Sequence, residues 1–337
     1  MLREMGIRVS VVIPVKNGGK IFEKLLRRLL TEQKIKPYEV IVVDDGSRDN
    51  TVDIARKYGV KVFFTGGGRG ANAGRNIGLR EARGDIIAFT DADCIPAEDW
   101  IESIIGKLRE KEVDGIAGST FIANPEYFLS RYLERSFLTP SPKYGSEVIL
   151  RKDFNPLLVV ATSNFAIKKL VSQKIGGFDE DFKWYGSDDM DFVYRMLKEG
   201  MTVLCTPKPV VYHFHRTSLK KALKRYFQYG QGFAVFSKKH PESSFTKKIK
   251  VGMLAMHSWL GLLLLIAILS IAYKFLAVLS LAMLLLTYLI PLSMYLCIKK
   301  VLTLEVLLYP FLDMLLILSS TLGFLYESLR QKVILIF

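Results

Sequence analysis

The first three quarters of the chain alternate between short apolar runs and amphipathic segments. Runs rich in branched apolar residues have the composition of buried strands at 9–13, 40–43, 60–64 and 86–89. The segments between them place apolar side chains at helical spacing, first through Ile21, Leu25, Leu26 and Leu29 and then at 51–58 and 73–82. This alternation predicts an α/β domain on a Rossmann-like, mostly parallel sheet that is covered on both faces.

A segment rich in Pro, Tyr, Ser and mixed charge interrupts this rhythm at 124–157. We interpret it as long and partly irregular. After it the pattern predicts a strand at Val159–Ala161, helices at 168–174 and 188–199, and short strands at 203–204 and 210–212.

The last quarter of the chain is nearly continuous Leu, Ile, Ala, Met and Val. Three stretches approach the ~20 residues that a membrane-spanning helix needs, at 251–272, 275–298 and 304–326. Lys274 and Lys299-Lys300 separate them, and the alternative is a buried helical core. Lysines before the first stretch and after the second predict that the folded domain is cytoplasmic and that three spans leave the C-terminus outside.

Net charge is +14, and the basic excess gathers between Lys208 and Lys250. Because this block ends where the apolar tail begins, it favours an anionic membrane surface over nucleic acid as partner. Residues 219–237 mix lysines with aromatic side chains, which is typical of an amphipathic helix in the headgroup layer or of a solvated helix with an aromatic core face. Three scattered cysteines indicate a reducing compartment, and no secretory signal is visible before the first strand.

Acidic residues follow two of the predicted strands. Asp91-Ala92-Asp93 comes directly after the strand at 86–89, and two carboxylates at this spacing suit Mg²⁺ or Mn²⁺. Asp44-Asp45-Gly46-Ser47 follows the strand at 40–43, either as a ligand-binding carboxylate or as a turn that caps the next helix. Ligand crevices in such sheets lie at the carboxyl ends of the strands, so both groups should face one crevice.

A glycine-rich loop at 66–76 enters a predicted helix. Its amides, with Arg69 or Arg75, are suited to a diphosphate. No Gly-Lys-Ser/Thr follows, so it is not a Walker loop.

In order and spacing, these motifs resemble glycosyltransferase family 2. The resemblance rests on Val12–Asn17, Ile41–Thr51, Ala73–Gly78, Phe89–Asp93, Gly176–Glu180 and Gly186–Asp191, and it covers roughly 9–240. It implies a GT-A fold and an inverting, metal-dependent transfer from a UDP- or GDP-sugar. The chain would then divide into a cytoplasmic GT-A domain at 1–218, a basic membrane-interface segment at 219–250 and a transmembrane domain of about three helices at 251–337.

The resemblance also assigns roles to residues. Asp44, with Asp45, Pro14, Lys16 and Asn17, would line the nucleobase pocket, and Arg75, Asp91 and Ala92 would lie near the nucleotide. Asp91, Asp93 and His213 would bind Mn²⁺ or Mg²⁺, with a packed histidine as the alternative for His213. Asp189 would be the general base, and Asp188 departs from the family, which usually has Glu there.

The acceptor is less constrained by these motifs. The spans and the basic aromatic stretch favour a hydroxyl of a lipid or lipid-linked glycan at the cell membrane. A polyprenyl-phosphate sugar synthase is the alternative, because its phosphate acceptor attacks without a base. A processive synthase is disfavoured because Gln-x-x-Arg-Trp is missing. A non-catalytic membrane protein would have lost the Asp pair or the base, and a nucleotidyltransferase would have a Gly-rich, basic opening at 12–19.

Overall fold

The computed structural model describes residues 6–139, 141–152, 160–182, 186–273 and 275–332. They form two compact units: Met1–Ser130 with Thr139–His215, and Arg131–Leu138 with Arg216–Phe337. The sequence did not indicate that a piece of the interrupted segment, Arg131–Leu138, belongs with the C-terminal part.

The first unit alternates strands and helices as predicted. Its strands are β1 (Val9–Val15), β2 (Glu39–Asp44), β3 (Lys61–Phe64), β4 (Ile86–Phe89), β5 (Cys94–Pro96), β6 (Gly115–Ile122), β7 (Val148–Leu150), β8 (Phe165–Lys168) and β9 (Val203–His213). Its helices are α1 (Gly19–Thr31), α2 (Thr51–Lys57), α3 (Ala71–Glu81), α4 (Trp100–Glu110), α6 (Lys169–Ile175) and α7 (Asp188–Lys198). Helix α5 (Phe128–Arg135) begins in the first unit and ends in the second.

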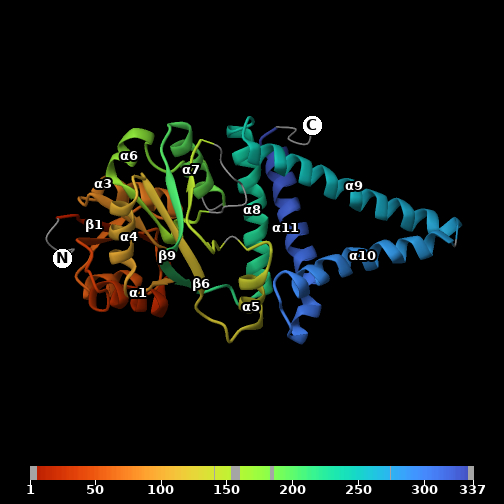
Figure 1. The fold of residues 1–337 in the computed structure, drawn as a ribbon, viewed down its shortest axis with the longest axis horizontal. Helices are drawn as coiled ribbons and strands as arrows, with labels where there is room; N and C mark the ends of the chain where they lie inside the picture. Colours follow the sequence, from red (N-terminus) through yellow and green to blue (C-terminus); the bar gives the residue numbers. More distant parts are fainter. Residues whose placement is uncertain (1–5, 140, 153–159, 183–185, 274, 333–337) are drawn as a thin grey trace. The chain divides into compact units, whose positions relative to one another are not determined.

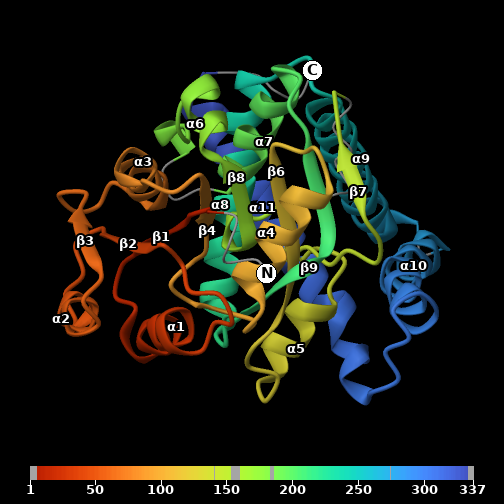
Figure 2. The same ribbon diagram turned by 60° about the vertical axis from the view of Figure 1, so that its left-hand side comes forward.

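These strands form one mixed, mostly parallel sheet in the order β3-β2-β1-β4-β8-β6-β9-β5, with β7 paired to β9 (Figure 2). Strands β3, β2, β1 and β4 run parallel, and β8 lies antiparallel between β4 and β6. Because β2 and β4 both flank β1 in parallel, their carboxyl ends lie at one edge of the sheet.

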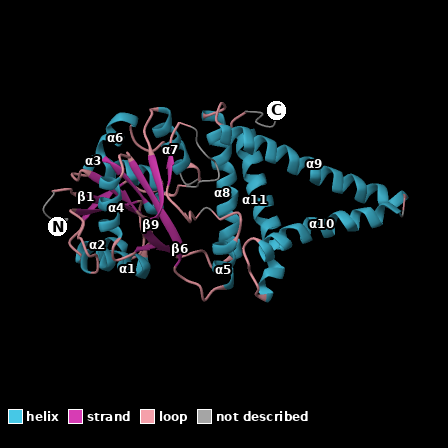
Figure 3. Cartoon of the chain, in the orientation of Figure 1, coloured by secondary structure: helices cyan, strands magenta, loops and turns pink. Residues whose placement is uncertain are grey.

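Helices cover both faces of the sheet (Figure 3). On one face, apolar side chains of α1, α2 and α4 pack with Val11, Ile13 and Val42. On the other face, α3 lies on Val12, and the rings of Phe89, Phe165, Phe178 and Phe192 pack together through stacked and edge-to-face contacts. In α1 the buried residues are Phe22, Leu25, Leu26 and Leu29, so Phe22 takes the inward position expected of Ile21.

Two predicted strands need correction. Val160 and Ala161 are not in a strand, and Val159 lies outside the described residues. They lead into a short 3₁₀ turn at Thr162–Asn164, and the strand is β8, where Phe165 and Ile167 are buried. The two short strands at 203–204 and 210–212 are one long strand, β9, whose pairing to β6 continues past an irregularity at Ala117/Ser119.

The second unit is helical. It contains α8 (Leu219–Lys239), α9 (Ser244–Ala272), α10 (Phe275–Cys297), a 3₁₀ segment at Leu304–Leu308 and α11 (Tyr309–Arg330) (Figure 1). Three stretches of the described residues are long and apolar enough to cross a membrane: Ser244–Ile271, Leu276–Cys297 and Leu304–Arg330. Such helices suggest membrane association.

Candidate functional site

Asp44 is the last residue of β2, and its side chain is buried at the carboxyl edge of the sheet. Its Oδ2 accepts hydrogen bonds from the amides of Gly46 and Ser47, each at 3.0 Å. Its Oδ1 is buried and has no hydrogen-bond partner among the described residues. A buried acceptor without a donor costs free energy unless a ligand supplies one.

Asp45 holds the glycine-rich loop in place. Its carboxylate accepts from the Thr65 hydroxyl and from the amides of Arg69 and Gly70. Burial by itself would raise the pKa of Asp45, but these three hydrogen bonds and the charge of Lys16 outweigh it, so the pKa is lowered. The loop needs glycines, because Gly66, Gly67, Gly68 and Gly70 all have positive φ.

The residues after β1 brace the same turn. The amide of Asn17 donates to Ser47 Oγ, and Asn17 Oδ1 accepts from the amide of Arg48, both at 2.8 Å. Asn17 has a φ of 55°, a conformation that asparagine tolerates better than most residues. Lys16 Nζ lies 3.6 Å from Asp45 Oδ2, and Pro14 is buried under α3. The predicted nucleobase residues therefore come together, with Asp45 and Asn17 tied to the loops.

Two glycines let α3 approach the sheet closely. A Cβ at Gly78 would lie 2.2 Å from Val12 Cγ1, and one at Gly74 would lie 3.0 Å from Pro14 Cβ. This contact buries Arg75, which is 4% exposed. The neighbouring Asn76 exchanges hydrogen bonds with the backbone of Phe178 and so links the Ala73–Gly78 and Gly176–Glu180 motifs.

Arg75 joins Asp91, a predicted metal ligand, to Asp188, the neighbour of the predicted base Asp189. Its Nη2 donates to Asp91 Oδ1 and its Nη1 to Asp188 Oδ2, both at 2.9 Å, and Nη1 also reaches Asn72 Oδ1 at 3.0 Å. Burial alone would lower the pKa of Arg75, but the charges of Asp91 and Asp188 outweigh it and raise the pKa. The guanidinium is therefore a fixed positive charge at the centre of the site.

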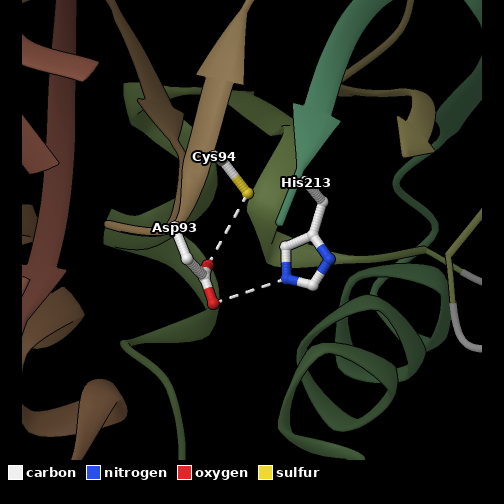
Figure 4. A group of neighbouring side chains, drawn as sticks. All are labelled: Asp93, Cys94 and His213. Carbon is white, nitrogen blue, oxygen red and sulfur yellow. Dashed lines mark hydrogen bonds and ion pairs between the residues drawn. The ribbon is translucent and has the colours of Figure 1, made fainter. Parts of the chain in front are cut away.

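Asp93 lies against His213 because β5 pairs with β9. Cys94 is opposite His213 in this ladder, and the Phe214 amide donates to the Asp93 carbonyl. Asp93 Oδ2 then lies 3.5 Å from His213 Nε2, and the Cys94 thiol is 3.9 Å from Asp93 Oδ1 (Figure 4). The three ligand atoms lie within 4.8 Å of one another.

His215 orients the ring of His213 by contacting its Nδ1 atom. The two Nδ1 atoms are 3.2 Å apart, so one must be a donor and the other an acceptor. Asn124 holds the backbone of His215 on both sides, accepting from its amide and donating to its carbonyl, each at 2.9 Å. This arrangement leaves Nε2 of His213 directed at Asp93, as in metal sites whose second imidazole nitrogen is hydrogen-bonded.

A divalent cation fits the Asp93–His213 pair. A carboxylate oxygen and an imidazole nitrogen suit Mn²⁺, which also takes oxygen ligands from phosphates. Cys94 is fully buried, and burial, with the charges of Asp93 and Asp91, raises its pKa well above the ordinary value. The thiol would have to lose its proton before it could bind a metal, whereas the Asp93 carboxylate and the His213 imidazole offer an oxygen and a nitrogen ligand. Asp91 is held by Arg75, which distinguishes it from Asp93.

Asp188 and Asp189 begin α7. The residue before them, Ser187, has a φ of 72° and a buried hydroxyl without a partner among the described residues. A non-glycine residue in this conformation costs roughly 1–3 kcal/mol, and such residues cluster at active sites and ligand clamps. Asp189 Oδ1 accepts a hydrogen bond from the amide of Met190 at 2.8 Å, in the first turn of α7.

The structure thus brings Arg75, Asp91 and Asp188 into one hydrogen-bonded group and Asp93 and His213 into another. Ala92 lies between the two groups and is partly buried against the core. Sequence reasoning missed Asn72, Cys94, His215 and Asn124. A second histidine two residues after His213 was the available signal for His215, whereas Asn124 lies in the interrupted segment and gave none.

Comparisons with known proteins find two glycosyltransferase family models within this chain. A family model described as glycosyl transferase family 2 matches residues 10–176, and one described as the N-terminal domain of galactosyltransferase matches residues 159–217. The pre-mycofactocin glycosyltransferase of Mycobacterium tuberculosis is 28% identical over 256 residues, which cover 75% of this chain and 52% of the relative. The glycosyltransferase AglE of Haloferax volcanii is 27% identical, covering 66% of this chain and 72% of AglE. The chain spans 25% and 52% of the length of two such relatives, a Pasteurella multocida chondroitin synthase and the mycobacterial enzyme.

Solved structures share the fold. The mannosyltransferase PcManGT from Pyrobaculum calidifontis, in complex with GDP-Man and Mn²⁺, superposes with a TM-score of 0.62 at 19% identity, over 96% of this chain and 88% of that one. TarS 1–349 of S. aureus, in complex with UDP-GlcNAc, gives a TM-score of 0.53 at 17% identity, over 97% and 93% of the two chains.

Proposed function

We propose that this chain, a member of glycosyltransferase family 2, transfers a sugar from a nucleotide sugar with inversion of the anomeric centre. The acceptor would be a hydroxyl of a lipid or lipid-linked glycan at a membrane. The first unit of the chain has the GT-A fold. The observation that carries the proposal is the Arg75 bridge, because it holds the donor-side Asp91 and the acceptor-side Asp188 in one site.

Donor recognition depends on Asp44, which has one carboxylate oxygen without a hydrogen-bond partner among the described residues. Oδ1 is buried and lacks a donor among the described residues, so an N–H of a uracil or guanine ring would satisfy it. Pro14, Lys16 and Asn17 lie beside the same turn, and Asp45 shapes the loop that follows. The diphosphate would lie toward Arg75 and the Asp91–Asp93 segment. UDP- and GDP-sugars both offer these groups.

Asp93 and His213 would hold the divalent cation, Mn²⁺ or Mg²⁺, with Asp91 held beside it by Arg75. When bound, the cation neutralises the charge that develops on the departing diphosphate. Asp189 would take the proton of the acceptor hydroxyl as its oxygen attacks the anomeric carbon. Arg75 pairs with Asp188 as well as with Asp91, so the negative charge of Asp188 beside Asp189 is partly compensated.

The acceptor proposal rests on the second unit. Its long apolar helices are those of a multi-pass membrane protein. Its lysine-rich α8 and α9 suit an anionic membrane surface. The first unit would then lie on the cytoplasmic side. A hydroxyl acceptor in or on that membrane would be glycosylated without leaving it.

A donor panel tests the function. The full chain in detergent, with Mn²⁺ and lipid extract, is incubated with UDP-, GDP- and dTDP-sugars while free nucleoside diphosphate is measured. We expect one donor to turn over and Asp189→Asn to lower kcat by roughly 10²–10⁴-fold. If no donor turns over, the proposal is wrong. If Asp189→Asn keeps full activity, a phosphate acceptor that needs no base replaces the hydroxyl acceptor.

A further inference from the structure

Helices α9 and α10 have the surfaces of membrane-crossing helices. In each helix, only 6% of the apolar 18-residue stretch is buried within the protein. The charged residues of α9 are confined to its first two turns, at Lys247, Lys248 and Lys250, and α10 has none. Their lengths of 29 and 23 residues exceed the ~20 that span the hydrocarbon. Figure 1 shows them meeting as a hairpin.

Helix α11 is also apolar, but its surroundings differ. In α11, 39% of the corresponding 18-residue stretch is buried. The buried side of the helix carries two acids, Asp313 and Glu327. Asp313 accepts hydrogen bonds from Tyr132, Ser136 and Tyr295 at 2.7–3.0 Å. Glu327 accepts from Gln231 Nε2 at 3.2 Å and from Gln331 Nε2 at 2.9 Å. Both acids are therefore satisfied by protein.

Helices α8 and α11 lie parallel in a fixed register. Ser319 Oγ donates to the Leu223 carbonyl, and Gln231 donates to Glu327, both across a separation of 96 residues. At the crossing the backbones almost touch: a Cβ at Gly323 would lie 1.9 Å from the Phe227 carbonyl oxygen, and one at Gly230 would lie 1.8 Å from that of Ser320. The pair therefore has to be placed in the membrane as one body.

This register fixes the depth of the lysines on α8. With this separation of 96 residues, Lys224 lies level with Ser320, near the middle of Tyr309–Arg330. If α11 crossed the bilayer, Lys220, Lys221 and Lys224, all exposed, would lie at the depth of the hydrocarbon core. Each such charge costs at least ~2.5 kcal/mol at the centre of a membrane.

The exposed side of α11 is a single apolar stripe. Its large exposed side chains are Phe311, Met314, Leu315, Ile317, Leu318, Leu322, Tyr326 and Leu329. Such a stripe can face lipid in a spanning helix or in a helix that lies in the plane of the interface, and the depth of the α8 lysines favours the interface.

We propose that α9 and α10 cross a lipid bilayer as a hairpin, while α8 and α11 lie together in the headgroup layer on one side of it. The lysines of α8 and of the start of α9 then face anionic headgroups. The chain crosses the membrane twice, so the residues before α9 and those after α11 are on the same side. Length and composition alone admit a third crossing, and the packing of α11 distinguishes it from the other two.

Single cysteines report the side of each loop. In a Cys297→Ser background, where the remaining Cys94 and Cys205 are buried, we place cysteine at Tyr273, Lys299 or Arg330. The full chain is reconstituted in sealed vesicles of phosphatidylcholine and phosphatidylglycerol and treated with a membrane-impermeant maleimide. We expect Lys299→Cys and Arg330→Cys to be labelled from one side and Tyr273→Cys from the other. Labelling of Lys299→Cys and Arg330→Cys from opposite sides, or of all three from one side, overturns the proposal.

A depth measurement provides a second test that does not depend on the loops. A nitroxide on Leu318→Cys, in the middle of the α11 stripe, is compared with one on Leu265→Cys in α9; both side chains are exposed. We expect the label at 265 to be relaxed mainly by dissolved oxygen and the label at 318 to be relaxed also by a water-soluble nickel chelate. Equal, deep positions for the two labels overturn the proposal.

Discussion

Asp91 and Asp93 are two residues apart, yet they belong to different kinds of site. Asp91 is paired with a buried arginine that also holds Asp188. Asp93 is half exposed, with 47% of its side chain accessible, and its ion-pair partner His213 bears a positive charge only when protonated. In the Arg75 group one positive charge already holds two carboxylates before any ligand arrives, whereas the Asp93–His213 pair is suited to a cation. Asp91 therefore helps to hold the site in shape, whereas Asp93 is placed to bind a cation.

Removing Asp93 should have the largest effect. We expect Asp93→Asn to weaken Mn²⁺ binding by on the order of 10²-fold or more, since even indirect partners of a metal contribute about 10–100-fold. Asp91→Asn is the matched variant and should change Mn²⁺ affinity by only a few-fold. Calorimetric titration of Mn²⁺ into the full chain measures both. Equal losses of Mn²⁺ affinity in the two variants would show that Asp91 binds the metal as directly as Asp93 does.

Removing Arg75 should mainly affect folding. Arg75→Met leaves Asp91 and Asp188 without their cation, and we expect a loss of about 3 kcal/mol in unfolding free energy, the low end for a broken buried pair because Asp91 is 34% exposed. Arg69→Met is the control: Arg69 pairs with Glu180 but is 53% exposed, so its loss should be at most about 1 kcal/mol. Denaturant midpoints in detergent measure both, and similar shifts would contradict a central role for Arg75.

His215 should matter less than the residues it supports. We expect His215→Leu to weaken Mn²⁺ binding by about tenfold, because His213 loses the partner of its Nδ1. His215→Asn places a polar atom near the same position and should restore most of the affinity. If both variants bind Mn²⁺ as the parent does, His215 only packs against His213.

Asp45 should give the smallest effect, and one that depends on pH. Its pKa is lower in the folded chain than its ordinary value of about 3.9. Its contribution is therefore present above about pH 4 and is lost as pH falls through the folded pKa. We expect Asp45→Asn to lower stability by about 1–2 kcal/mol at neutral pH and to approach the parent at acid pH. A difference that stays constant between pH 7 and pH 3 would exclude the charge as the cause.

Local patterns predicted most of the first unit, because β-branched runs such as 9–13 and 40–43 leave few alternatives to a buried strand. They also placed Asp44 and Asp91 at strand ends. They did not predict β8 correctly, since the apolar run before Asn164 has the same composition as a strand. Nor did they separate Asp91 from Asp93, because that difference arises from a helix packed by Gly74 and Gly78 and from a ladder between β5 and β9, neither of which is local.

The division of the chain into units has a consequence for biosynthesis. Arg131–Leu138 is made early, but its partners in the second unit, among them Glu305 and Asp313, are made near the end. The sheet can form while the ribosome is still synthesising α9, whereas this short segment has to wait for α11. During that interval the nascent chain exposes Tyr132, a side chain that is fully buried in the finished protein. Folding of the last helix therefore completes a part of the protein that was translated long before it.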